Sequence, residues 1–424
     1  MERYSSYKDS GISWIGEIPE HWELRHLSQV SYEHYISNKE VHHQNLLSLS
    51  YGRIKRKDIN TAEGLLPASF DTYQIVEEGN IVMRLTDLQN DHKSLRVGLV
   101  KEEGIVTSAY VCLGVYDSIF PSYLYNVLHS YDIKKLFYSM GGGLRQNLNW
   151  QGLKKLDIPL PLKDEQQAIV AYIEEKCQMI DAYVADKEKE IELLQEMKQK
   201  TIADAVTKGL NPDAKMKDSG ISWIGEIPEH WEVKRIASLF TGKVQANTDF
   251  KYHHAFKFYY GTLVPKNEVG DVEEYRDTYV KYSILQKDDI MINGLNLNYD
   301  FVSQRVAIAP SDGIITSAYV VARPRKGTNA QYYNYLFKTM DNMKLFHGMG
   351  TGIRLTLSFD EMKKQVVVVP PLDEQQAIVA YIEEKCEKID KLASELQSEI
   401  DYLKEYKQRL IADCVTGQVN VSGV

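Results

Sequence analysis

Hydrophobic and polar positions follow two patterns that alternate along this chain. In the first pattern, short β-branched runs at residues 79–83, 97–100 and 109–115 are separated by Gly, Asn, Asp and Pro, which is typical of short strands. Residues 121–139 and 329–346 interrupt this pattern with aromatic and aliphatic side chains at helical spacing. The mixture predicts globular domains of the α+β class.

The second pattern is a run of polar and charged residues that contains no Gly or Pro for about 40 positions, and it occurs twice. Such runs predict long helices. Asp164 and Asp373 are predicted N-caps, with Gln167 and Gln376 three residues later as in a capping box. At about 1.5 Å per residue, each helix would be roughly 60 Å long.

Apolar residues recur along both predicted helices with alternating spacings of four and three. So narrow a seam on a charged helix requires a partner helix, and the other long helix is the obvious one. We therefore predict an antiparallel coiled coil; the alternative is that each helix packs on its own domain. The predicted seam residues are Ile173, Cys177, Ile180, Val184, Ile191 and Leu194 in the first helix, and Ile382, Cys386, Ile389, Leu396, Ile400 and Leu403 in the second.

The chain repeats itself with a constant offset of 209 residues. Residues 8–23 and 217–232 share the sequence KDSGISWIGEIPEHWE, and residues 164–177 and 373–386 share DEQQAIVAYIEEKC. The period is far too long for a solenoid repeat of about 20 to 50 residues. Two whole domains, each with its own helix, fit the period better.

The repeat and the two patterns together predict five segments. They are a first domain at 1–162, a first helix at 163–209, a second domain at 210–371, a second helix at 372–416 and a tail at 417–424.

Between the identical blocks, matching residues keep the 209-residue offset, while particular segments differ in sequence. Tyr51-Gly52 corresponds to Tyr260-Gly261, yet residues 53–57 (RIKRK) stand opposite TLVPK. Residues 84–91 (RLTDLQND) likewise stand opposite NGLNLNYD at 293–300. The domains therefore share one backbone plan that carries two different sets of loop side chains.

Composition limits the partners and the compartment. The chain has 424 residues and a formal net charge of -9, so no overall positive field attracts nucleic acid, and a basic surface must be local or completed by another subunit. Four cysteines without CxxC spacing indicate reduced thiols. The longest aliphatic run covers only residues 366–369, so we expect no membrane span and a cytoplasmic location.

Motifs of the common enzyme classes are absent from the sequence. It contains no GxxxxGKS/T phosphate loop, no HExxH zinc motif, no GxSxG elbow and no Asn/Asp-Pro-Pro-Tyr/Phe motif of amino-methyltransferases. The histidine pairs at 42–43 and 253–254 lack accompanying metal-ligand spacing, so exposed loop histidines are favoured over a metal site. We expect a chain without catalysis or bound metal; a coiled-coil scaffold for other proteins is the remaining alternative.

The sequence resembles the specificity (S) subunits of type I restriction-modification systems. The resemblance rests on the duplicated SGISWIGEIPEHW, on the strand at residues 157–161 that leads into DEQQ and a long helix, and on the equivalent join at residues 370–376. It implies that each divergent domain is a target-recognition domain that reads one half of a bipartite site in double-stranded DNA. The helices would set the spacing and dock two methyltransferase (M) subunits, and motor-nuclease (R) subunits would join for restriction. S-adenosylmethionine, ATP and Mg would then belong to these partners, with no cofactor in this chain.

Base reading requires Arg or Lys for guanine and Asn or Gln for adenine, and the segments that differ between the copies supply them. The alternative for any single residue is a solvated surface position. The candidates are Arg53, Lys55, Arg56, Lys57, Arg84, Gln89 and Asn90 in the first copy and Lys257, Lys266, Asn293, Asn296 and Asn298 in the second. Arg145 and Arg354 end two equivalent glycine-rich turns and are candidate phosphate contacts, although a structural turn is equally compatible.

Overall fold

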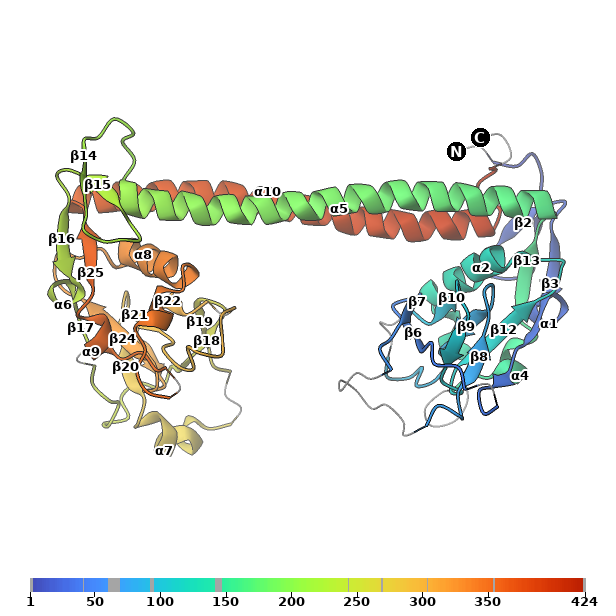
Figure 1. Cartoon of the computed structure of the whole chain (residues 1–424), viewed down its shortest axis with the longest axis horizontal. Helices are drawn as coiled ribbons and strands as arrows, with labels where there is room; N and C mark the ends of the chain where they lie inside the picture. Colours follow the sequence, from blue (N-terminus) through green and yellow to red (C-terminus); the bar gives the residue numbers. More distant parts are fainter. Residues whose placement is uncertain are drawn as a thin grey trace. The chain divides into compact units, whose positions relative to one another are not determined.

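The computed structural model describes residues 3–40, 42–59, 69–91, 95–141, 147–242, 244–267, 270–302, 304–353 and 355–421 (Figure 1). The chain divides into two compact units: Met1–Glu188 with Gln397–Val424 form unit 1, and Lys189–Leu396 form unit 2. Each unit contains short strands and helices, so the predicted mixed α+β class is confirmed.

Unit 1 begins with a domain of short antiparallel strands. Its elements are β1 (Tyr7–Asp9), β2 (Glu17–Pro19), β3 (Glu23–His26), α1 (Leu27–Val30), β4 (Ser31–Glu33), β5 (Ile36–Ser37), β6 (Leu47–Ser50), β7 (Arg53–Arg56), β8 (Gln74–Val76), β9 (Ile81–Met83), β10 (Val97–Leu99), β11 (Gly104–Val106), β12 (Val111–Val115), α2 (Pro121–Ile133), α3 (Leu136–Met140), α4 (Trp150–Leu153) and β13 (Asp157–Leu160). The main sheet has the strand order β10-β9-β12-β4.

Alternation along β9 divides the core of this domain into two layers. Ile81 and Met83 point to one face of the sheet, where they share a cluster with residues of α2, and Val82 points to the other face, where it packs with Leu47 and Val76. Because successive strand residues face opposite sides, a strand that is buried on both faces is apolar throughout.

Unit 2 repeats this plan. Its elements are β14 (Met216–Asp218), β15 (Glu226–Pro228), β16 (Glu232–Arg235), α6 (Ile236–Leu239), β17 (Phe240–Thr241), β18 (Phe256–Tyr259), β19 (Thr262–Pro265), η1 (Val272–Tyr275), α7 (Arg276–Tyr279), β20 (Ser283–Leu285), β21 (Ile290–Ile292), β22 (Val306–Ile308), β23 (Gly313–Ile315), β24 (Val320–Pro324), α8 (Ala330–Asn342), η2 (Leu345–Gly348), α9 (Phe359–Met362) and β25 (Val366–Val369). The sheet order β22-β21-β24-β17 is that of unit 1 with every strand 209 residues later.

The helical segments predicted at 121–139 and 329–346 are each interrupted. Lys135 and Lys344 adopt left-handed backbone conformations with φ of 61° and 59°, so α2 is followed by the separate short helix α3, and α8 by η2. The apolar spacing continues across the break, which is why the sequence pattern did not indicate it.

Two long helices, α5 (Lys163–Lys208) and α10 (Leu372–Val415), pass through both units. In unit 1, Nζ of Lys407 lies 2.6 Å from Oδ1 of Asp181. In unit 2, the equivalent Nζ of Lys198 lies 2.6 Å from Oδ1 of Asp390. The same contact therefore joins the two helices in each unit.

The predicted seam residues are all buried or half-buried. Those that are buried are Ile173, Val184, Ile382, Cys386, Ile389, Leu396 and Ile400, and those that are half-buried are Cys177, Ile180, Ile191, Leu194 and Leu403. None of the helices in the described part of the chain is both long enough and apolar enough to cross a membrane.

The predicted capping boxes are wrong. The backbone N–H groups of Gln166 and Gln375 donate to the carbonyls of Leu162 and Pro371, so the helices start before Asp164 and Asp373, whose carboxylates lie in the first turn. Negative charge is favourable there because it faces the positive end of the helix dipole. The buried side-chain amide of Gln166 donates to the carbonyl of Pro161, and that of Gln375 to Pro370, so these glutamines hold the join between strand and helix.

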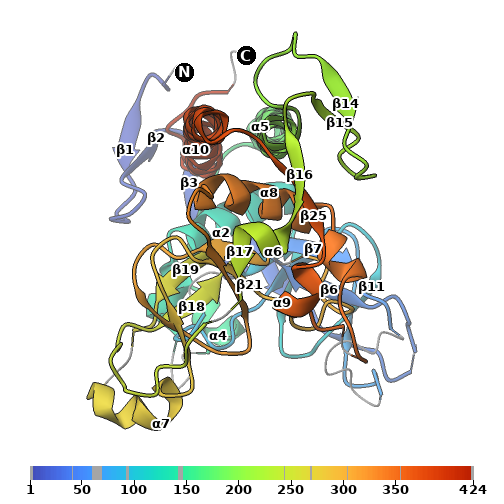
Figure 2. The same cartoon turned by 90° about the vertical axis from the view of Figure 1, so that its left-hand side faces the viewer.

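The end of each long helix packs into the core of a domain. Figure 2 faces unit 2, where α8 lies directly below the helices, and the hydroxyl of Tyr332 donates to the carbonyl of Val206 at 2.7 Å. In unit 1, the hydroxyl of Tyr123 on α2 approaches the carbonyl of Val415 on α10 at 3.4 Å. Domain and helices therefore form one packed body within each unit.

Candidate nucleic-acid interface

The first segment that differs between the copies is one strand of a hairpin. Strand β7 pairs with β6 in unit 1, and β19 pairs with β18 in unit 2. The turns are Tyr51-Gly52, with φ of 47° and 75°, and Tyr260-Gly261, with φ of 43° and 73°. Two residues with positive φ define a type I′ turn, whose twist suits a two-residue hairpin.

Strand alternation separates the hairpin residues into an inner and an outer face. Leu49 pairs with Ile54 and packs toward the domain, whereas Ser48 pairs with Lys55 on the outer face. Arg53 and Lys55 are both exposed, and Nη2 of Arg53 lies 4.0 Å from Oδ2 of Asp181 on α5. The outer face of the first hairpin therefore presents two cations.

The same segment holds two more candidate cations, Arg56 on the opposite face of β7 and Lys57 after its end. Arg56 forms a two-pronged ion pair with Glu102, which raises the pKa of Arg56 and lowers the pKa of Glu102 through the hydrogen bonds between them. Lys57 follows the strand and is exposed. Arg56 is thus engaged within its own domain, whereas Lys57 is open to solvent.

The two lysines predicted in unit 2 have different surroundings. Lys257 is exposed on the outer face of the second hairpin, where it pairs with Val264. The ammonium of Lys266 lies 5.9 Å from the ring centre of Tyr279 and 5.7 Å from that of Tyr282, a cation–π arrangement that ties the end of β19 to its domain. This difference could not be predicted from the sequence.

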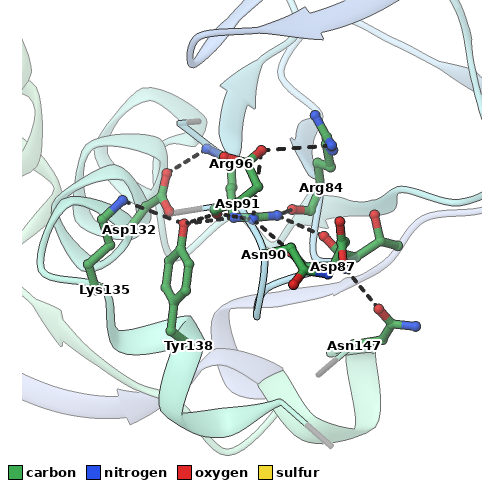
Figure 3. A network of polar contacts seen from close by, with 10 residues as sticks. Arg84, Asp87, Asn90, Asp91, Arg96, Asp132, Lys135, Tyr138 and Asn147 are labelled. Carbon is green, nitrogen blue, oxygen red and sulfur yellow. Dashed lines mark hydrogen bonds and ion pairs between the residues drawn. The ribbon is translucent and has the colours of Figure 1, made fainter. Parts of the chain in front are cut away.

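The second segment that differs is a loop wrapped around a buried arginine, seen for unit 1 in Figure 3. Arg96 has 0% of its surface exposed, and Arg305 in unit 2 has 1%. A buried guanidinium requires several hydrogen bonds, because the loss of its hydration costs several kcal/mol.

In unit 1, the loop itself supplies most of these hydrogen bonds. Nη1 of Arg96 donates to the carbonyls of Arg84 and Thr86 at 3.1 and 2.9 Å, and Nη2 donates to those of Asp87 and Asp91 at 3.4 and 2.5 Å. These four carbonyls belong to residues 84–91, which is the segment that differs between the copies.

Three further groups hold the arginine itself. Its backbone N–H donates to Oδ2 of Asp132 at 2.5 Å, and Nε donates to the hydroxyl of Tyr138 at 2.9 Å (Figure 3). Burial raises the pKa of Asp132. Oδ2 of Asp91 lies 4.0 Å from Nη2 and supplies a nearby negative charge.

Unit 2 reproduces most of this arrangement. Nη1 of Arg305 donates to the carbonyls of Asn293 and Leu295 at 3.0 and 2.8 Å, and Nη2 to that of Asp300 at 2.8 Å. Its Nε is buried and has no hydrogen-bond partner among the described residues. His347 stands where unit 1 has Tyr138. We call each guanidinium with its carbonyl partners the arginine clasp.

The candidate side chains of unit 1 occupy different depths of the clasped loop. Arg84 is half-buried, with Nη2 3.8 Å from Oδ2 of Asp91. Nδ2 of Asn90 donates to Oδ1 of Asp87 at 2.7 Å, and Gln89 is exposed.

In unit 2, Asn296 is exposed with φ of 52°, and Asp87 in the first loop has φ of 56°, so the loops share this left-handed position. Asn293 accepts from the N–H of Leu295, and Asn298 donates to the carbonyl of Ile353, so both support the loop. Arg145 and Arg354 lie outside the described residues.

Arg96 and Arg305 were missed by the sequence reasoning. They stand 209 residues apart, each followed by a valine, and this signal was available in the sequence. Both are kept in the two copies, whereas base reading predicts residues that differ between them. In the described parts of the chain, no group of three or more His, Cys, Asp and Glu side chains is arranged to hold a metal ion.

The fold and these two sites define a duplicated α+β protein that presents, from each domain, one hairpin and one clasped loop beside long helices. Residues 228–402 match the family described as the type I restriction modification DNA specificity domain. The chain is similar to that family over these residues, and along its length it resembles type I specificity subunits.

Two curated relatives come from Methanocaldococcus jannaschii. The putative type I restriction enzyme MjaX specificity subunit is 23% identical over 96% of both chains. The type I restriction enzyme MjaVIII specificity subunit is 23% identical over 76% of both.

Two solved structures share the fold. A chain from a structure on assembly and conformational transition of the type I R-M system has a TM-score of 0.65 at 14% identity, covering 95% of this chain and 99% of that one. The HsdS subunit from Thermoanaerobacter tengcongensis has a TM-score of 0.52 at 14% identity, with 95% and 98% covered. At these identities the likeness concerns the fold.

Proposed function

We propose that this chain is the DNA specificity subunit of a type I restriction-modification complex, without catalysis of its own, in which each domain reads one half of a bipartite duplex target. One observation carries the proposal: the two domains keep the same frame, the same turn and the same buried arginine, and differ in the strand and loop attached to them. Two unlike half-sites require different base-reading side chains on one shared backbone.

The side chains that we assign to base reading are those that the frame leaves accessible. Arg53, Lys55 and Lys57 in unit 1 are exposed, as are Lys257 and Asn296 in unit 2. Arginine and lysine match the acceptors of guanine, and asparagine matches adenine. Arg56, Lys266 and Asn298 are assigned a supporting role, because their side chains already bind groups of their own domain.

We assign the helices to the spacing between half-sites. Two helices paired as an antiparallel coiled coil would form a spacer of fixed length, and one turn of B-DNA spans about 34 Å, so a fixed length selects a fixed number of unread base pairs. The equivalent Lys407–Asp181 and Lys198–Asp390 pairs support this pairing.

Each unit also carries exposed apolar side chains on its helix segments, which supports docking of two methyltransferase subunits. In unit 1, Met179, Tyr183 and Tyr402 are 60%, 45% and 67% exposed. In unit 2, Leu392, Leu193 and Met197 are 41%, 55% and 49% exposed. Tyr183 and Leu392 are 209 residues apart, as are Leu193 and Tyr402. Exposed side chains at these corresponding positions favour two copies of one partner.

The chemistry would come from those partners. S-adenosylmethionine would bind to the methyltransferase subunits, and ATP and Mg would serve the motor-nuclease subunits that join for restriction. This chain would contribute the choice of sequence.

The test is to express the chain with its methyltransferase and to sequence the methylated positions in the host DNA. We expect a split motif with a constant gap. A continuous motif, or methylation without sequence preference, would contradict the proposal. Duplex binding at low salt provides a second test, because a scaffold protein would bind the split site no more tightly than random DNA.

A further inference from the structure

The tips of the two hairpins carry an exposed tyrosine in an unfavourable backbone conformation. Tyr51 and Tyr260 have φ of 47° and 43° and are 77% and 72% exposed. Asn, Asp and Gly are favoured at this position of a type I′ turn, and a bulky residue with positive φ is strained. Strain of this kind, repeated at an exposed site, points to a use outside the fold.

The fold accounts for the glycine of each turn but leaves the tyrosine unexplained. A Cβ at Gly52 would lie 3.1 Å from Cβ of Leu95, and one at Gly261 would lie 2.5 Å from Oε1 of Gln304. Gly52 and Gly261 also have positive φ. The tyrosine rings, by contrast, are mostly in solvent, and asparagine would adopt the same turn more readily.

The retention of tyrosine contrasts with the change that follows it. RIKRK follows the first tip and TLVPK the second, although both strands make the same hairpin. The tyrosines therefore serve a purpose that the two domains share, while the strands serve purposes that differ. If the domains read unlike base sequences, the feature common to both targets is the sugar-phosphate backbone.

The surroundings of the tips suit a phosphate. Lys55 is exposed on the outer face of the first hairpin, as is Arg53, whose Nη2 lies 4.0 Å from Oδ2 of Asp181. Lys257 is exposed on the second hairpin, next to Tyr259 and Thr262 near its tip. Tyrosine hydroxyls are common donors to DNA phosphates, and such contacts fix register without reading sequence. The cations and hydroxyls at the tips do not suit an apolar protein partner.

We propose that Tyr51 and Tyr260 bind the sugar-phosphate backbone of the duplex and position each domain on it, independently of base sequence. The assignment rests on the proposed function. In each hairpin, the tip positions the domain on the duplex and the strand that follows reads the bases.

The test compares Tyr51→Asn and Tyr260→Asn, singly and together, with Tyr51→Phe and Tyr260→Phe in the complex of the full chain with its methyltransferase. Asparagine suits the turn, so the melting temperature of the chain should stay the same or rise. Affinity for the split-site duplex and for an unrelated duplex should fall by a similar factor, about fivefold or more for each Asn variant. The methylated motif should remain that of the parent.

The Phe variants divide the contact into its ring and its hydroxyl. If the hydroxyl binds phosphate, Phe should weaken binding nearly as much as Asn does. Tyr35→Asn is the matched control, because Tyr35 is 60% exposed and has Val244 at the equivalent position; it should leave affinity unchanged.

Three results would overturn the assignment: DNA affinity unchanged in the double Asn variant, a changed methylated motif, or a loss of affinity that follows entirely from weaker assembly with the methyltransferase. The last result would assign the tips to a protein contact. Failure of the proposed function would look different, because the parent complex would then bind no duplex in preference to another.

Discussion

The indole N–H of Trp22 donates a hydrogen bond to Oε1 of Glu165 at 3.0 Å. Trp231 makes the equivalent bond to Oε2 of Glu374 at 2.8 Å. Both tryptophans are fully buried. The bond joins the two blocks that are identical between the copies, SGISWIGEIPEHWE and DEQQAIVAYIEEKC. These blocks are the two sides of one joint between domain and helix, which explains why both are kept.

Replacement of Trp22 by Phe should destabilise unit 1. The change removes a hydrogen bond to a charged carboxylate and leaves a small cavity, which together cost about 2 to 4 kcal/mol. Urea unfolding of the purified chain measures this loss. Glu175→Gln, at an exposed position of α5, is the control and should have little effect. Equal stability of Trp22→Phe and the parent would show that the joint does not depend on this bond.

Replacement of Arg96 by Lys should disturb one half-site only. An ammonium cannot reach four carbonyls at once, so some would be left buried without a donor, at about 1 to 3 kcal/mol each. We expect methylation of the host motif to lose preference in one half, and Arg305→Lys to affect the other half. Lys101→Met, an exposed position on the same domain, should preserve both. The prediction fails if both halves keep their bases.

Replacement of His347 by Tyr should stabilise unit 2 by about 1 kcal/mol. In unit 1, the hydroxyl of Tyr138 accepts from Nε of Arg96 and donates to the carbonyl of Asp91. His347 contacts the equivalent carbonyl of Asp300 at 3.1 Å, but Nε of Arg305 is left buried without a partner among the described residues. A tyrosine would serve both groups. Thermal unfolding measures the gain, and Tyr138→His should produce the opposite change.

Acid should destabilise unit 1 through His129. Burial lowers the pKa of His129 to about 4, against about 6.5 in an unfolded chain. The unfolded state therefore binds more protons, and stability falls as the pH drops from 6.5 toward 4, by about 3 kcal/mol in full.

His129→Gln should show a shallower loss of unfolding free energy between pH 7 and pH 4.5. The exposed His254→Gln serves as the control and should follow the parent. Parallel curves for the parent and His129→Gln would contradict the burial of a neutral imidazole.

Deletion of one heptad from each helix, residues 189–195 together with 393–399, should shorten the gap in the DNA motif. The deleted stretches are opposed, since Lys187 lies 3.7 Å from Glu399 and Lys198 2.6 Å from Asp390. The loss of about 10 Å corresponds to about three base pairs, with both half-sites unchanged. Deletion from one helix alone should abolish activity. An unaltered gap would rule out the helices as the spacer.

Much of the fold could be predicted from periodicity, because the spacing of apolar residues indicates which side chains are buried. The strands at 81–83 and 111–115 lie within predicted β-branched runs, and both long helices lie where Gly and Pro are absent. The break at Lys135 could not be predicted, because a left-handed residue leaves no mark in an apolar pattern.

The candidate site was harder to predict, because partners distant in sequence decide which charges are available. Arg53 and Arg56 look alike in RIKRK, but the carboxylate of Glu102 engages Arg56, which alternation places on the other face of the strand. The role of the buried Arg96 could not be predicted because the residue is the same in both copies. Nothing in the sequence indicates that it binds the loop whose side chains differ between them.

The arginine clasp has a consequence for how new specificities arise. Each Nη atom of Arg96 and Arg305 is bonded to main-chain oxygens, which every amino acid provides. Side chains on the loop can therefore be exchanged by mutation or recombination without removing the bonds that shape it. A lineage that carries this clasp can explore new DNA targets one residue at a time while the protein continues to fold.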